Sequence, residues 1–211
     1  MLLFMTISMK TITASFKIIL SKQIELGYYM PEILNPPAAE QEIAAVEDLL
    51  DIKFNEELKE LYAIANGIYN DYKTPSGLTG LIPIHNFLSI ADAVQYYKNG
   101  IEIEECFTNY EHHFKPGVKL FPFLEDGAGN CYWVDLNSGT RNEGQIFWTN
   151  TFGQDPDYLY HSLTNLFYTI AEGYEVGLFS LDAEHYLSLD YDQFDKLSAR
   201  HNPELLYWQD K

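Results

Sequence analysis

The sequence is short of basic residues. Its 211 positions hold 13 Lys and Arg against 31 Asp and Glu, which gives a formal net charge of −18 at pH 7. Nucleic-acid binding and docking to anionic membranes both depend on clustered Lys and Arg. The scarcity of bases therefore argues against nucleic acid and against a membrane as partner, and it favours a soluble protein with a basic partner.

Cysteine is also scarce. The two cysteines, Cys106 and Cys131, are too few for a disulfide framework in a chain of this length. There is no Cys-x-x-Cys pair, no Cys/His cluster at zinc spacing and no Asn-x-Ser/Thr glycosylation acceptor. These absences predict a protein of the reducing cytoplasm that holds no metal and needs no cofactor.

Long apolar runs are missing, although 46% of the residues are hydrophobic. No run reaches the roughly 18 residues of a membrane span. The apolar start of the chain is not preceded by a base and ends at Lys10, so it lacks the charged beginning of a signal peptide. We treat residues 1–37 as an N-terminal extension and predict one domain over residues 38–211, with an acidic helical tail.

The motifs of the common enzyme classes are absent as well. No Gly-rich dinucleotide loop, P-loop, zinc-protease helix or nucleophile elbow occurs. Adjacent Glu125 and Asp126 precede a Gly-rich stretch, where a turn explains the acids better than a shared catalytic proton does. The leading prediction is a protein without catalytic residues; a hydrolase built on Asp126, Asp135 and a histidine stays open as the alternative.

The sequence does contain segments with helical periodicity. Apolar residues recur every three or four positions over residues 39–50 and again after Asn55, a plausible N-cap. Gly67 would end the second helix in a left-handed conformation. Three more helices are expected after capping residues: Ser89 to about Asn99, closed by Gly100; Ser162 to Tyr174; and Asp190 to about Arg200. Residues 12–20 fit a strand or a short helix equally well.

Three short apolar-aromatic runs lie in the middle of the chain, at 118–124, 130–136 and 145–149. The compact turns between them contain glycine, and Gly127 or Gly129 is expected at positive φ. Such runs predict an antiparallel meander. The fold class is therefore α+β: a single domain with a mainly antiparallel sheet, whose central three-strand meander is packed by N- and C-terminal helices.

Four stretches in order resemble the SUKH superfamily, the Smi/Knr-type family. They are FNEELKELYAIANG at 54–67, GLIPIH at 80–85, FPFLEDGAGNCYWVD at 121–135 and GQIFW at 144–148. No one of them is specific, but their order and spacing are, and the resemblance extends over about residues 38–176. Six matched positions are interpreted as determinants of the fold: Gly67, Pro83, Gly127, Gly129, Asp135 and Trp148.

The resemblance implies a non-enzymatic binding domain. Many bacterial members of the family resemble immunity proteins that neutralise toxins, often nucleases, and fungal relatives resemble scaffolds in cell-wall signalling. The leading functional prediction is an immunity protein that binds a toxin domain. The alternative is a regulatory or scaffold module without a toxin. The sequence does not determine the oligomeric state.

One long stretch carries acids without any base. Residues 142–195 contain no Lys or Arg and ten Asp and Glu residues. On a family-like scaffold this stretch predicts the surface that meets the basic partner, with aromatic residues as anchors. The predicted partner contacts are Asp155, Asp157, Tyr158, Glu172 and Glu175. The alternative, that these acids only solvate a loop and a helix face, stays open.

Overall fold

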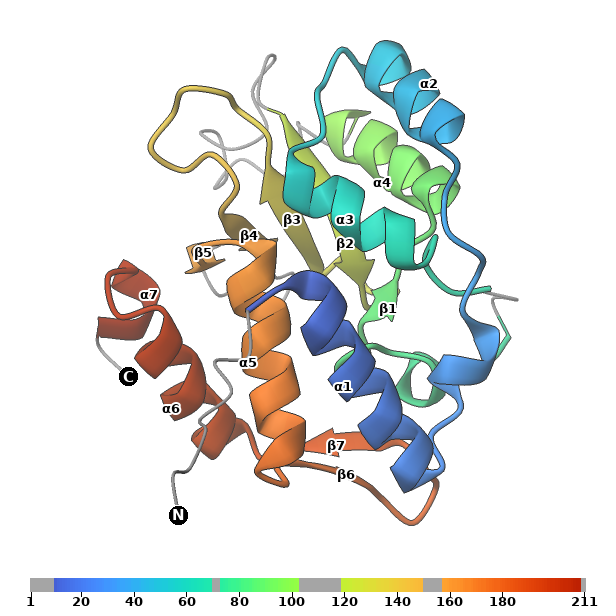
Figure 1. Cartoon of the computed structure of the whole chain (residues 1–211), viewed down its shortest axis with the longest axis vertical. Helices are drawn as coiled ribbons and strands as arrows, with labels where there is room; N and C mark the ends of the chain where they lie inside the picture. Colours follow the sequence, from blue (N-terminus) through green and yellow to red (C-terminus); the bar gives the residue numbers. More distant parts are fainter. Residues whose placement is uncertain (1–9, 70–72, 103–118, 150–156, 210–211) are drawn as a thin grey trace, which may run out of the picture.

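The structure, a computed structural model, describes residues 10–69, 73–102, 119–149 and 157–209 (Figure 1). Its centre is a five-stranded antiparallel sheet in the order β1-β2-β3-β4-β5. The strands are β1 Asn86–Phe87, β2 Leu120–Glu125, β3 Cys131–Asp135, β4 Ile146–Thr149 and β5 Asp157–Tyr160. The predicted α+β class and the predicted meander are both confirmed, because the three expected runs are β2, β3 and β4.

Alternation along the strands divides the sheet into two faces. Phe121 pairs with Val134 and faces the main core, whereas Trp133 pairs with Phe147 and belongs to a second, smaller cluster. Every residue of β2 and β3 is buried. Both faces are therefore covered, as the apolar character of these strands predicts.

The β2–β3 turn explains the acidic Gly-rich stretch. Asp126 accepts backbone hydrogen bonds from Ala128 at 2.8 Å and from Asn130 at 3.0 Å. Gly127 and Gly129 have φ values of 76° and 94°, in the left-handed region that glycine adopts without a Cβ penalty. Asp126 thus has a structural role in holding this turn.

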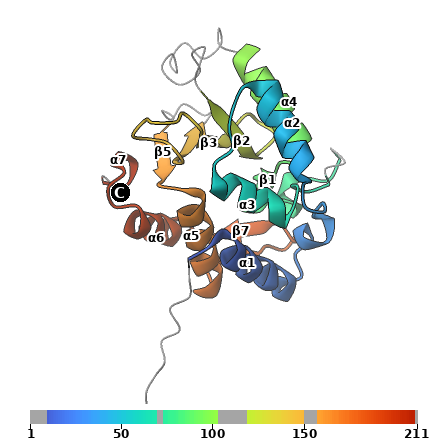
Figure 2. The same cartoon turned by 45° about the horizontal axis from the view of Figure 1, so that its top comes forward.

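Helices cover the core face of the sheet (Figures 1 and 2). Helices α1 Ile12–Leu26 and α5 Leu163–Glu175 lie side by side, with α3 Glu56–Ile64 next to them. The ring of Phe16 on α1 packs 5.6 Å from that of Phe167 and 6.2 Å from that of Phe87. The segment before residue 37 therefore supplies part of the core, and its ambiguous run is a helix.

The remaining helices differ from the predictions at their ends. Helix α2 Glu40–Leu50 matches its expected span, but α4 Ile90–Glu102 continues past Gly100, which therefore does not close it. Helix α3 ends at Ile64, three residues before Gly67, because Ala65 is already extended with a φ of −156°. Two short 3₁₀ helices are also present, Met30–Ile33 and Ser76–Leu78.

The Asn66-Gly67 pair joins α3 to the start of α4. The Asn66 side chain accepts a hydrogen bond from the Ile90 N–H at 2.8 Å, which satisfies an otherwise open donor of that helix. Gly67, at φ 68°, lies against the backbone of Leu88 and Ser89. The pair is therefore a packing junction and not the helix cap that its sequence suggests.

Residues 82–85 form a tight turn with Pro83 inside it and an isolated bridge from Ile82 to His85. One segment folds differently from the prediction. The C-terminal tail is not wholly helical: β6 Phe179–Leu181 and β7 Leu187–Leu189 pair as a hairpin before α6 Tyr191–His201 and α7 Leu206–Gln209. Strands of three residues are too short to show a period of two.

Glu47 ties α2 to the start of α3. Its buried carboxylate accepts a hydrogen bond from the Phe54 N–H at 2.8 Å and pairs with Lys53 at 3.1 Å. Burial opposes ionisation, but the Phe54 N–H and the Lys53 ammonium together lower the pKa of Glu47. The charged form is therefore the one that the fold favours.

We expect Glu47→Gln to lower the free energy of unfolding by about 1–2 kcal/mol at pH 7, because a charge-assisted hydrogen bond is lost. A lowered folded-state pKa stabilises the fold above the unfolded value of about 4.3 and loses this effect as pH falls. The gap between variant and wild type should thus shrink below about pH 4 in urea melts. Exposed Asp48→Asn is the matched control, and an equal loss in both variants would contradict this role of Glu47.

Candidate functional site

The predicted partner contacts do not gather in one patch. Asp157 and Tyr158 begin β5, whereas Glu172 and Glu175 lie at the far end of α5, which runs from β5 towards the β6–β7 hairpin (Figure 1). Asp155 lies outside the described residues. The predicted contacts that the structure describes therefore lie on two separate surfaces.

Tyr158 is half-buried and tied to the sheet. Its hydroxyl donates a hydrogen bond to the buried Asp135 carboxylate at 2.6 Å, and its ring packs 5.1 Å from that of Phe147. Burial and the Asp135 carboxylate raise the pKa of Tyr158 far above its ordinary value. Asp157 borders a surface groove of about 360 Å³ together with Arg141. Tyr158 thus links β5 to Asp135, a role that its half-buried position favours over partner contact.

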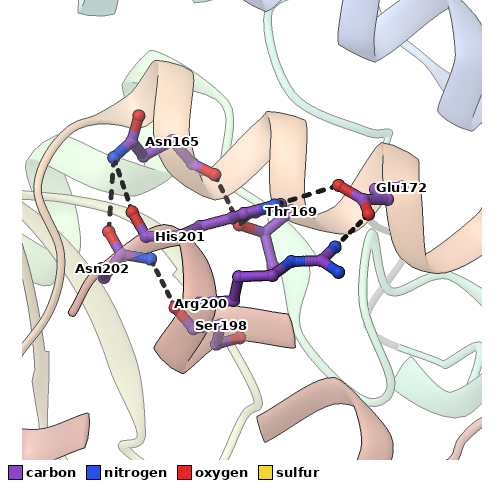
Figure 3. A network of polar contacts seen from close by, with 7 residues as sticks. All are labelled: Asn165, Thr169, Glu172, Ser198, Arg200, His201 and Asn202. Carbon is purple, nitrogen blue, oxygen red and sulfur yellow. Dashed lines mark hydrogen bonds and ion pairs between the residues drawn. The ribbon is translucent and has the colours of Figure 1, made fainter. Parts of the chain in front are cut away.

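Glu172 belongs to a polar network that fastens α6 to α5 (Figure 3). Its carboxylate pairs with Arg200 and lies 2.9 Å from Nε2 of His201. The other ring nitrogen, Nδ1, lies 2.9 Å from the Thr169 hydroxyl, and Asn165 reaches the His201 carbonyl. Only Glu175 of the α5 pair is exposed.

Two histidines make stability depend on pH. Burial lowers the pKa of His85 and that of His201, although neighbouring carboxylates oppose the shift in both cases. A histidine with a lowered pKa is neutral in the fold, while the unfolded chain takes up a proton near pH 6.5. Stability is then complete at higher pH and declines as pH falls below that value.

We therefore expect the free energy of unfolding to fall between pH 7.5 and pH 5.5 in urea melts. His85→Gln should flatten this decline, since it removes a group that binds a proton only after unfolding. Exposed His185→Gln is the matched control. An unchanged slope in His85→Gln would contradict the contribution of His85.

An aromatic pocket of about 320 Å³ opens where the C-terminal elements meet the sheet. The sheet side supplies Ile82, Pro83, His85, Tyr132, Trp148, Leu159 and Tyr160, and the C-terminal side supplies Leu189, Tyr191, Phe194, Asp195, Tyr207 and Trp208. Six of these residues are tyrosine or tryptophan. We call this cavity the aromatic pocket.

The rings of the pocket meet mostly at steep angles. Trp148 and Tyr207 are 6.4 Å apart with planes at 71°, and Tyr207 and Trp208 are 4.7 Å apart at 87°. His85 stands edge-on to Tyr132 at 5.1 Å and 79°. Trp133, by contrast, packs in the opposite cluster, where its indole N–H bonds to Thr149 at 3.0 Å. Trp148 and Trp208, of the three tryptophans, line the pocket.

Two buried polar atoms of the residues that line the pocket have no hydrogen-bond partner within the described part of the chain: Nε2 of His85 and Nε1 of Trp148. Nδ1 of His85 lies 2.9 Å from the Pro83 carbonyl, so it carries the proton and leaves Nε2 as an acceptor. Buried groups without partners are exceptions in folded proteins, and each costs about 1–3 kcal/mol.

Sequence reasoning missed most of this pocket. Its walls come from five segments: the Pro83 turn, strands β3 to β5, the end of β7, the start of α6, and α7. None of these segments carries a motif that indicates a ligand. The tryptophans were the available signal, and their number alone does not show that two of them share a cavity.

The enzymatic alternative gains no geometric support. Asp126 lies in the β2–β3 turn and Asp135 at the opposite end of β3, so the two carboxylates do not face each other. Burial raises the pKa of the Cys131 thiol, which is the unreactive direction for a nucleophile. Within residues 10–69, 73–102, 119–149 and 157–209, no three His, Cys, Asp or Glu side chains are grouped as metal ligands.

Exposed acids lie on the C-terminal elements, as they also do on α2 and at the start of α3. Five of them lie at the end of α5, on the hairpin and at the start of α6, along the lower edge of Figure 1: Glu175, Asp182, Glu184, Asp190 and Asp192. We call this surface the C-terminal acidic face. Asp182 and Asp190 also accept backbone hydrogen bonds within these elements. Asp190 caps α6 by accepting from the Gln193 N–H at 3.1 Å. Among the helices that the structure describes, none is both long and apolar enough to cross a membrane.

A family model described as the SMI1 / KNR4 family (SUKH-1) matches residues 37–172, more than half of the chain. No curated protein matches the sequence. The matched segment extends from just before α2 into α5. It leaves α1 on one side, and the hairpin, α6 and α7 on the other, so the aromatic pocket combines matched and unmatched segments.

Proposed function

The chain belongs to the SMI1 / KNR4 family (SUKH-1), and from this membership we propose that it is a non-catalytic protein-binding domain that neutralises a toxin with a basic surface. The observation that carries the proposal is the C-terminal acidic face on a chain of net charge −18. Family membership makes a binding role the starting point, and the charge selects the chemistry of the partner.

A nuclease toxin fits this chemistry best. Such an enzyme holds its phosphate substrate in a cationic groove, and clustered carboxylates can occupy that groove in place of nucleic acid. Long-range attraction would speed the encounter towards about 10⁸–10⁹ M⁻¹s⁻¹ at low salt. Fast capture suits an immunity protein, which must act before the toxin does.

Charge alone would not hold the complex, because exposed ion pairs contribute little to affinity. Buried aromatic contacts usually supply most of the binding energy at an interface. Tyr191 is 59% exposed and lies between Asp190 and Asp192, and Tyr186 is 38% exposed at the hairpin tip. These two rings are the anchors that the C-terminal acidic face offers.

The test is capture followed by growth rescue. The full chain is immobilised, partners are recovered from the source organism, and each captured protein is expressed alone and together with this chain. We expect a basic protein that stops growth alone and is harmless when co-expressed. A captured partner without effect on growth would overturn the immunity function and favour the regulatory module, and an acidic partner would contradict the charge argument.

A further inference from the structure

We propose that the aromatic pocket is a binding site for an arginine side chain of the protein partner. The proposal rests on the proposed function in one respect, that the partner is basic. It assigns to the pocket a ligand of defined chemistry, which the C-terminal acidic face alone does not.

The walls of the pocket suit a flat organic cation. Aromatic faces attract cations through the ring quadrupole within about 6 Å of the centroid, and Trp and Tyr attract them best. Trp148, Tyr207 and Trp208 present rings at steep angles to one another, so a guest can meet a face of one ring and the edge of the next. A guanidinium also stacks on such faces and is more weakly hydrated than an ammonium, which favours arginine over lysine.

The described lining of the pocket carries negative charge. Among the residues that the structure describes around this cavity, Asp195 has a formal charge and none is Lys or Arg. Glu125 and Asp126 act electrostatically on His85 from the sheet side, and Asp195 acts on Tyr132, Tyr160 and Tyr191 from the helix side. An anionic guest would be repelled from both sides, whereas a cation is attracted.

The Asp195 carboxylate completes the match to an arginine residue. A guanidinium has five N–H donors and no acceptor, so it can donate to this carboxylate in the pocket wall. Nε2 of His85 and Nε1 of Trp148 have almost no accessible surface, so the match does not depend on them.

The position of the pocket connects it to the C-terminal acidic face. Tyr191 lines the pocket, and its neighbours Asp190 and Asp192 belong to that face. A basic segment attracted by these acids would thus arrive beside the pocket. The cavity, at about 320 Å³, is near the lower limit of small-ligand sites, which suits one long side chain rather than a cofactor.

The test uses the full ¹⁵N-labelled chain and N-acetyl-L-arginine methylamide as the probe. We expect saturable shifts of the Trp148 indole N–H signal with a Kd of about 1–10 mM, a range typical of an isolated side chain. The Trp133 indole, on the opposite face of the sheet, is the internal control and should not move. The neutral analogue N-acetyl-L-citrulline methylamide should bind at least about tenfold more weakly.

Two matched variants locate the effect. Asp195→Asn should weaken binding of the arginine probe about fivefold or more, while Asp192→Asn, on the same helix but outside the pocket, should leave it unchanged. No saturable shift at Trp148 in the wild type, or equal binding of the arginine and citrulline probes, overturns the proposal. Equal effects of the two variants overturn it as well.

These outcomes are independent of the toxin. Probe binding without any basic partner would leave the pocket assignment standing and remove the proposed function. A captured basic partner with no probe binding would do the reverse.

Discussion

Replacing Gly67 with alanine will lower the free energy of unfolding by more than about 4 kcal/mol or prevent folding. A Cβ at this position would lie 2.2 Å from the Ser89 nitrogen and 2.4 Å from the Leu88 carbonyl carbon. Both atoms are backbone, so no flexible side chain can move away. The positive φ of 68° adds the strain of a left-handed residue, about 1–2 kcal/mol.

The size of this effect follows from what the junction holds. Ile68 donates to the Phe87 carbonyl at 2.9 Å, and Asn35 donates to the Gly67 carbonyl at 3.0 Å. Pushing the Leu88–Ser89 backbone away would therefore disturb β1 and the start of α4 together. Losses above about 4 kcal/mol are exceptional for one residue and need a clash of this kind.

Gly139→Ala is the matched control. Gly139 has a φ of 77°, and a Cβ there would meet nothing within 4 Å. This variant should lose only about 1–2 kcal/mol, from backbone strain alone. Urea or thermal melts of the two variants make the comparison, and similar losses in both would show that Gly67 acts through its φ and not through close approach.

Neutralising three acids of the C-terminal acidic face will slow capture of the partner by about tenfold or more at low salt. Glu175→Gln, Glu184→Gln and Asp192→Asn are combined, since these exposed side chains make no hydrogen bond or ion pair among the described residues. The change leaves local structure intact and takes the net charge from −18 to −15, that is −18 + 3. Steered association depends on the charge nearest the interface.

The control removes the same charge elsewhere. Glu40→Gln, Asp48→Asn and Glu56→Gln lie on α2 and α3, away from the hairpin (Figure 1). This triple variant has the same net charge but should keep an on-rate within about twofold of wild type. Stopped-flow or surface-based kinetics at low and physiological salt compare the two. Equal slowing would mean that net charge, and not this face, steers the partner.

Local signals in the sequence were sufficient for much of the fold. The caps at Asn55, Ser162 and Asp190 form as expected, because a side-chain oxygen three residues before a free backbone N–H needs no tertiary partner. The meander could also be predicted from local patterning, since short glycine-containing turns place consecutive strands next to each other. These elements depend on residues close together in the chain.

The remainder depends on contacts between distant residues. Gly100 was predicted to end a helix, but α4 continues through it because a single glycine only weakens a helix. Glu172 was predicted to face a partner, yet it pairs with Arg200 and His201 from a helix some 28 residues later. The aromatic pocket has the same origin, because its walls combine residues 82–85 with residues 189–208.

The most direct test of the account is amide hydrogen exchange of the full chain, free and bound to its captured basic partner. The account predicts that binding slows exchange in the hairpin and the start of α6, residues 177–195, with little change in α2 and α3 at residues 40–64. Protection confined to residues 40–64, with residues 177–195 exchanging as in the free protein, would contradict the claim that this chain binds its partner through the C-terminal acidic face.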